Sequence, residues 1–136
     1  MDTLKHVADK YKVDLTKPSP FPIHCGRFED IPALFTELGF KVGAEVGVES
    51  GSYSAYLLKG IPGLKLYGVD MWESYSGYKD FTHHKLTEAS QLAVENTKEY
   101  DCKLIKGWSQ DVVKQFQDES LDFVFIDANH AYEFVV

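Results

Sequence analysis

The chain alternates short apolar runs with helical segments, and this alternation constrains its fold more than any other feature. Residues 41–48, 64–70, 102–106 and 121–127 have the character of strands. The clearest of these runs are apolar along their whole length, which is typical of a parallel sheet covered on both faces. Helical patterns separate them, so right-handed βαβ units are expected. The sequence therefore predicts an α/β fold.

Two helical segments precede this pattern. Residues 3–11 carry apolar side chains at helical spacing, and a second helix is expected from Asp30 to Gly39. Three prolines in residues 17–22 forbid regular structure between them. We therefore expect residues 1–40 to form an N-terminal helical segment with a Pro-rich connector. Residues 41–136 would form a Rossmann-like domain, with a further helix opening at residue 130.

The composition excludes several classes of partner. With 14 Lys plus Arg against 21 Asp plus Glu, the net charge is −7, so a nucleic-acid backbone is not expected as the main partner. No stretch approaches the roughly 18 apolar residues that span a bilayer, and no apolar run suggests a signal peptide. We therefore expect a cytoplasmic protein without a membrane partner.

A glycine-containing loop follows the first strand, with the sequence EVGVESGSYS over residues 45–54. Ligands of open α/β sheets bind beyond the carboxyl ends of the strands. Gly47 and Gly51 permit a sharp turn and close approach to a ligand, although a plain tight turn is the alternative. The spacing is not the G-x-G-x-x-G of a dinucleotide site, which disfavours a nucleotide-dependent oxidoreductase. Glu45 and Glu49 flank the place where phosphates would lie, and this charge pattern favours a cation.

The second strand ends at Asp70, a position from which a carboxylate can accept hydrogen bonds from both hydroxyls of a ribose. A helix cap or a surface charge is the alternative. An adenosine that lacks phosphates and carries a positively charged tail satisfies both the loop and Asp70. S-Adenosylmethionine is such a molecule.

Three motifs in order resemble class I S-adenosylmethionine-dependent methyltransferases. They are GAEVGVESGSYS at residues 43–54, KLYGVDMW at residues 65–72 and LDFVFIDANHAYE at residues 121–133. The resemblance is greatest to bacterial, archaeal and phage families whose fourth strand ends in Asp-x-x-His-x-(Tyr/Phe)-Glu. It runs from about Asp30 to the C-terminus and implies a Rossmann-like parallel sheet of the class I type.

The resemblance implies roles for matching residues in the cofactor site. Glu45 would bind the methionine ammonium, directly or through water, and Gly47 and Gly51 would pass beneath the cofactor. Asp70 would hold the ribose. The remaining predicted cofactor-binding residues are Ser54, Met71, Trp72, Ser109 and Asp127. Met71 and Trp72 would border the adenine and Ser109 its edge. Core packing for Trp72 and an N-cap for Ser109 are the alternatives.

Candidates for catalysis cluster after the fourth strand. Methyl transfer from a sulfonium needs mainly a positioned nucleophile and, where required, removal of its proton. Asp127 would lie near the donated methyl, and His130 is either a general base or a capping or substrate-orienting residue. In some related O-methyltransferases an aspartate here is one ligand of Mg²⁺, so Asp127 is also a candidate metal ligand. The adjacent His83 and His84 point apart on a helix and are expected to be solvated.

The resemblance implies a finished helix, a fifth strand and a final antiparallel pair beyond Val136. Without them the fourth strand is an exposed edge, which a truncated chain or a completing partner, including a second copy, would explain. The sequence thus predicts the cofactor-binding half of a small-molecule methyltransferase, with oxygen as the expected acceptor atom. The alternative is a cofactor-binding or partner-assembled fragment without turnover.

Overall fold

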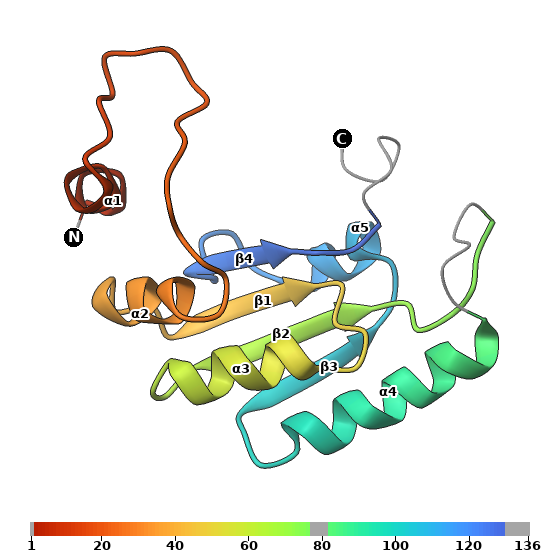
Figure 1. Cartoon of the computed structure of the whole chain (residues 1–136). Helices are drawn as coiled ribbons and strands as arrows, with labels where there is room; N and C mark the ends of the chain where they lie inside the picture. The colour runs from red at the N-terminus through yellow and green to blue at the C-terminus, as the bar shows by residue number, and fades with distance from the viewer. Residues whose placement is uncertain (1, 77–81, 130–136) are drawn as a thin grey trace. The chain divides into compact units, whose positions relative to one another are not determined.

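In the computed structural model, which describes residues 2–76 and 82–129, four parallel strands form a single sheet. The strands are β1 (Val42–Val46), β2 (Lys65–Asp70), β3 (Cys102–Lys106) and β4 (Phe123–Ile126). Their order is β3-β2-β1-β4, and every neighbouring pair is parallel. The prediction of an α/β fold with a Rossmann-like parallel sheet is confirmed (Figure 1).

Helices cover both faces of this sheet. The connecting elements are α3 (Ser52–Gly60), α4 (His83–Thr97), α5 (Ser109–Val112) and the short 3₁₀ helix η1 (Val113–Gln115). Figure 1 shows α3 and α4 side by side on one face and α5 on the other. The strand residues alternate accordingly: Phe125 contacts Tyr53 of α3, whereas Tyr67 packs edge-on against Phe116 beyond η1.

Three of the strands are shorter than the runs that predicted them, and β3 has the predicted bounds. β1 ends at Val46 because Gly47 has φ +92° and turns the chain out of the sheet. At its other end, the Asp122 carboxylate accepts hydrogen bonds from the backbone N–H groups of Lys41 and Val42 at 2.7 and 2.9 Å. Asp122 therefore precedes β4 in the chain but stabilises the start of β1.

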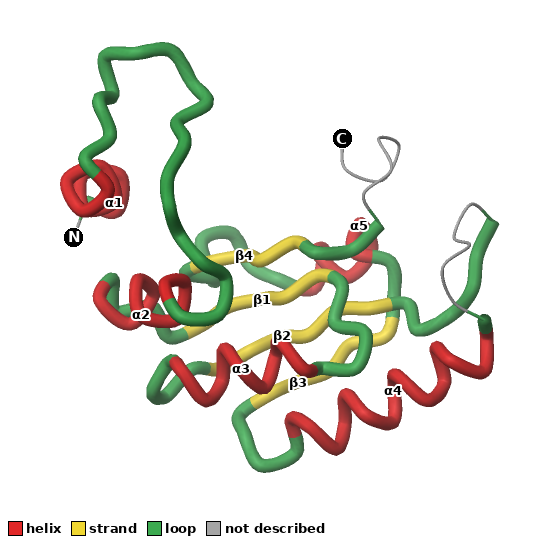
Figure 2. Tube along the Cα trace, in the orientation of Figure 1, coloured by secondary structure: helices red, strands yellow, loops and turns green. Residues whose placement is uncertain are grey.

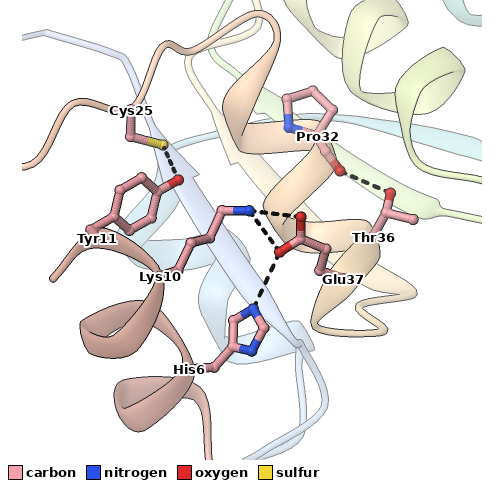
Figure 3. A network of polar contacts seen from close by, with 7 residues as sticks. All are labelled: His6, Lys10, Tyr11, Cys25, Pro32, Thr36 and Glu37. Carbon is pink, nitrogen blue, oxygen red and sulfur yellow. Dashed lines mark hydrogen bonds and ion pairs between the residues drawn. The ribbon is translucent and has the colours of Figure 1, made fainter.

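The chain divides into two compact units, Met1–Gly39 and Phe40–Val136. The first contains α1 (Thr3–Tyr11), α2 (Asp30–Glu37) and the proline-rich segment between them. The Glu37 carboxylate of α2 accepts hydrogen bonds from Lys10 at 2.7 and 2.8 Å and lies 3.2 Å from His6 (Figure 3). Because Lys10, and then His6, favour its charged form, the pKa of Glu37 lies below its ordinary value.

The loops that follow the strands meet at one end of the sheet (Figure 2). This arrangement is a consequence of parallel strand order, since all four carboxyl ends point the same way. Among the helices of the described residues, none combines the length and apolar character needed to cross a membrane. The predicted helix from residue 130 lies outside the described residues.

Candidate functional site: an acidic cavity at the strand ends

A cavity of about 380 Å³ lies at the carboxyl ends of the strands, within the size range of small-molecule sites. Its lining comprises Val46, Gly47, Glu49, Val69, Asp70, Met71, Glu73, Tyr75, Leu86, Gly107, Trp108, Ser109, Ile126, Asp127, Ala128 and Asn129. Four of these residues carry carboxylates. None of the described lining residues is Lys, Arg or His. The cavity is therefore suited to a cationic or hydroxyl-rich ligand rather than to a phosphate.

Gly47 lines the cavity where β1 gives way to the loop. A Cβ at Gly47 would overlap the backbone of Asp127 and Ala128, and its φ of +92° disfavours any side chain. Its N–H donates to the carbonyl of Val69 at 2.9 Å. Glycine is thus needed here because the chain after β1 passes directly against the chain after β4.

Asp70 fastens the loop by its carboxylate. One oxygen, Oδ2, accepts hydrogen bonds from the N–H groups of Val48 and Glu49, both at 2.9 Å. The other, Oδ1, accepts one from the N–H of Trp72 at 2.8 Å. Asp70 also lines the cavity, so the same carboxylate shapes the loop and faces the ligand space.

Trp72 lies in the core rather than in the cavity. It is 5% exposed and packs with Val48 and Ala93, while its indole N–H donates to the carbonyl of Glu49 at 2.8 Å. The Trp72 side chain therefore packs in the core, which is the alternative that the sequence left open. The tryptophan that lines the cavity is Trp108. Its ring contacts that of Tyr75 edge-on at a centroid distance of 4.8 Å.

Glu45 and Ser54 lie beneath the loop and form a buried pair. Glu45 is 1% exposed and Ser54 is fully buried, and the Ser54 hydroxyl donates to the Glu45 carboxylate. Neither residue lines the cavity. Their predicted contact with a cofactor stays a prediction, and it would require the ligand or a water to reach below Gly47.

Gly51 packs against a helix. A Cβ on Gly51 would lie 2.9 Å from the Cα of Ala93, so this glycine lets the start of α3 approach α4. Its N–H closes the loop on the carbonyl of Val48 at 2.9 Å. The Asn96 side chain also donates to the carbonyl of Ser50 at 2.9 Å. The loop is therefore held by contacts to both β2 and α4.

The other predicted residues, Met71, Ser109 and Asp127, line the cavity. The N-cap alternative for Ser109 is wrong, because Trp108 occupies that position and Ser109 is the first helical residue. Asp127 follows β4, and its N–H donates to the carbonyl of Val46 at 2.8 Å. His130 lies outside the described residues.

Several cavity residues were not predicted from the sequence. The Asn129 amide donates to the Tyr75 hydroxyl at 3.1 Å, joining the chain after β4 to the chain after β2. Glu73 pairs with Lys106 at 2.6 Å, and this hydrogen bond lowers the pKa of the Glu73 carboxyl. The sequence feature that could have identified Trp108 as a cavity residue is its position after a strand end, where parallel sheets bind ligands.

The predicted metal site receives no further ligands from the described residues. Within residues 2–76 and 82–129 no group of three His, Cys, Asp or Glu side chains could hold a metal ion. Asp127 alone therefore does not complete a Mg²⁺ site there, since Mg²⁺ requires near-octahedral oxygen coordination.

Comparisons with solved structures agree with the fold. The O-methyltransferase from Bacillus cereus in complex with SAH superposes with a TM-score of 0.54 at 19% identity, covering 94% of this chain and 55% of that one. The O-methyltransferase TomG from Streptomyces achromogenes, in complex with SAM, gives a TM-score of 0.56 at 16% identity, covering 95% and 54%. A putative O-methyltransferase from Klebsiella pneumoniae gives 0.56 at 18%, covering 94% and 54%. At these low sequence identities, the structural similarity shows the fold alone.

The chain thus spans about half the length of the solved structures that it matches. No curated protein matches the sequence. A family model described as a methyltransferase domain matches residues 44–136, which is more than half of the chain and includes every residue of the cavity. The chain therefore belongs to the methyltransferase domain family.

Proposed function

We propose that the chain is the cofactor-binding half of an S-adenosylmethionine-dependent methyltransferase that methylates an oxygen of a small molecule. The observation that carries the proposal is the charge of the cavity, which has four carboxylates and no basic side chain among its described lining residues. A sulfonium and an ammonium group suit such a lining, whereas a pyrophosphate does not. Solved structures with the same fold contain SAH or SAM.

The cavity offers a place for each part of the cofactor. Asp70 would accept a hydrogen bond from the ribose through Oδ1, which among the described backbone N–H groups receives that of Trp72. Met71, Trp108 and Ser109 would border the adenine, and the indole ring would supply a flat apolar surface. The Gly47 backbone would let the ligand approach the end of β1.

Asp127 is the proposed catalytic residue. S-Adenosylmethionine, when bound, supplies a methyl group that is already activated as a sulfonium, so the protein has mainly to orient the acceptor and hold its proton. Asp127 lines the cavity at the end of β4, where its carboxylate would hold the hydroxyl of an acceptor. A role for His130 as base or orienting residue, and Mg²⁺ bound at Asp127, stay predictions, and no step is derived through the metal.

A second candidate function is a binding fragment without turnover. It is favoured by the outer edge of β4, which pairs with no further strand within the described residues. A second copy of the chain could cover that edge. A cytoplasmic location stays a prediction, and the absence of a nucleic-acid partner is part of the proposal on the acidic composition.

Replacing Asp70 tests the cofactor assignment. We expect Asp70→Ala to weaken S-adenosylhomocysteine binding by at least about tenfold, because a charge-assisted hydrogen bond to the ribose is lost. The same change should lower the free energy of unfolding by about 2 kcal/mol, because three loop and strand-end N–H groups lose their acceptor.

Calorimetric titration and urea denaturation measure the two effects of Asp70→Ala. Asp118→Ala, at an exposed turn, is the control and should change neither quantity. Unchanged affinity for S-adenosylhomocysteine in Asp70→Ala would refute the ribose assignment.

A further inference from the structure

The four carboxylates that line the cavity differ in their partners. Glu73 is paired with Lys106, and Asp70 accepts three backbone hydrogen bonds. Asp127 has interactions of its own. In the part of the chain that the structure describes, the Glu49 carboxylate makes no hydrogen bond or ion pair. Among these four carboxylates, Glu49 is therefore the one whose whole acceptor capacity is open to a ligand within the described residues.

The backbone of Glu49 is held in an unfavourable conformation. Its φ of +52° lies in the left-handed region, which costs a residue with a Cβ about 1 kcal/mol or more. Two hydrogen bonds fix it there: its N–H donates to Asp70, and its carbonyl accepts from the Trp72 indole, at 2.9 and 2.8 Å. Such strain persists where the surroundings over-determine the backbone, and it is concentrated at functional sites.

A count of acceptor positions shows what a ribose would need beside Asp70. An ionised carboxylate has about four lone-pair positions, and the Asp70 carboxylate already accepts three hydrogen bonds. One position remains, on Oδ1, whereas the two ribose hydroxyls bring two donors. A second acceptor is required, and the cavity-lining residue bonded through its own backbone to Asp70 is Glu49.

We propose that Glu49 is a specificity-determining residue that accepts a hydrogen bond from one ribose hydroxyl while Asp70 accepts from the other. The inference rests on the proposed function, since it concerns the same cofactor. In this arrangement Asp70 and Trp72 hold the Glu49 backbone, and the Glu49 carboxylate binds a hydroxyl of the sugar. The site therefore selects a ribonucleoside over a deoxyribonucleoside by two carboxylates from different loops.

The test is a calorimetric titration of the full chain with S-adenosylhomocysteine and its 2′-deoxy and 3′-deoxy analogues. We expect Glu49→Ala to weaken binding of S-adenosylhomocysteine by roughly tenfold or more, the effect of losing a hydrogen bond to a charged group. With one of the two deoxy analogues, wild type and Glu49→Ala should bind within about twofold of each other. Glu49→Gln, which keeps an acceptor oxygen, should have an intermediate affinity for S-adenosylhomocysteine.

Glu119→Ala is the matched control, because Glu119 is an exposed glutamate with a similarly left-handed φ of +59° that does not line the cavity. It should leave the affinity for all three ligands unchanged. All these variants keep a Cβ at position 49, so the strain at that position is unchanged. The proposal is overturned if Glu49→Ala binds S-adenosylhomocysteine like wild type, or loses the same factor with both deoxy analogues. Absence of S-adenosylhomocysteine binding by wild type would instead refute the proposed function itself.

Discussion

At the scale of single residues, the two glycines of the loop after β1 have different structural roles. Gly47 lies against the backbone after β4 and lines the cavity, whereas Gly51 lies against Ala93 of α4. Both have positive φ values, +92° and +73°. The same residue type therefore serves ligand approach at one position and helix packing at the other.

Gly47→Ala should lower the free energy of unfolding by about 2 kcal/mol or more, because a side chain there combines positive φ with overlap on the Asp127 backbone. Gly63→Ala is the matched control: its φ is +74°, and the nearest atom to a Cβ there is the Lys41 Nζ at 3.9 Å. The free energy of unfolding of this variant should fall by about 1 kcal/mol, because only the conformational cost of positive φ applies. Urea denaturation of both variants measures the difference. Equal losses of unfolding free energy would contradict the close approach of Gly47 to the Asp127 backbone.

Which residues line the cavity could be predicted from the sequence only in part. Gly47, Asp70 and Asp127 lie at strand ends, where parallel sheets bind ligands, whereas Met71 and Ser109 were predicted from the resemblance to class I methyltransferases. Trp72 has a positive φ of +45°, and its side chain packs in the core under the loop without lining the cavity, so its contact with adenine stays a prediction. No pattern in the sequence reveals a left-handed residue that is not glycine. The same limit applies to Glu49.

At the scale of elements, the short apolar runs predicted all four strands, but their ends depended on contacts between distant segments. β1 begins where Asp122 accepts its N–H groups, which the sequence of β1 does not show. The helical segment between β3 and β4 begins at Ser109, directly after Trp108, and ends as the 3₁₀ helix η1. Boundaries of this kind follow from capping rather than from apolar spacing.

The ion pairs between α1 and α2 also belong to this scale (Figure 3). Glu37→Gln should speed amide hydrogen exchange in α1 at neutral pH, because Lys10 and His6 lose a charged partner. Since the folded pKa of Glu37 is lowered, its contribution is present above the ordinary carboxyl pKa and is lost as the pH falls through the lowered value. The difference between wild type and variant should therefore shrink in acid.

Hydrogen exchange followed by mass spectrometry measures this effect. Glu29→Gln is a suitable control, because Glu29 is exposed and its side chain forms no capping hydrogen bond to α2. Equal exchange rates in α1 for wild type and Glu37→Gln at neutral pH would mean that the ion pairs do not hold the two helices together.

At the scale of the whole molecule, β4 is an edge strand within the described residues. Val124 and Ile126 are 52% and 70% exposed, on the sheet face opposite the one that Phe125 presents to α3. An apolar parallel edge of this kind favours pairing with another chain. The resemblance to class I methyltransferases implied an exposed edge at the fourth strand, and the order β3-β2-β1-β4 places β4 at an edge of the described sheet.

The chain should therefore self-associate with rising concentration, and Val124→Lys should reduce that association because a charge on an edge opposes pairing. Val113→Lys, at an equally exposed apolar position on η1, is the control and should leave it unchanged. Sedimentation velocity over a concentration series distinguishes these outcomes. A chain that stays monomeric throughout, or equal effects of the two lysines, would contradict a role for the β4 edge.

The central claim is that the acidic cavity accepts a cationic adenosine rather than a pyrophosphate-bearing nucleotide. Parallel calorimetric titrations of the 136-residue chain with S-adenosylhomocysteine and with NAD⁺ test it most directly. The four carboxylates and the absence of basic side chains among the described lining residues predict saturable binding of S-adenosylhomocysteine and no measurable binding of NAD⁺. Binding of NAD⁺ without binding of S-adenosylhomocysteine would contradict the account.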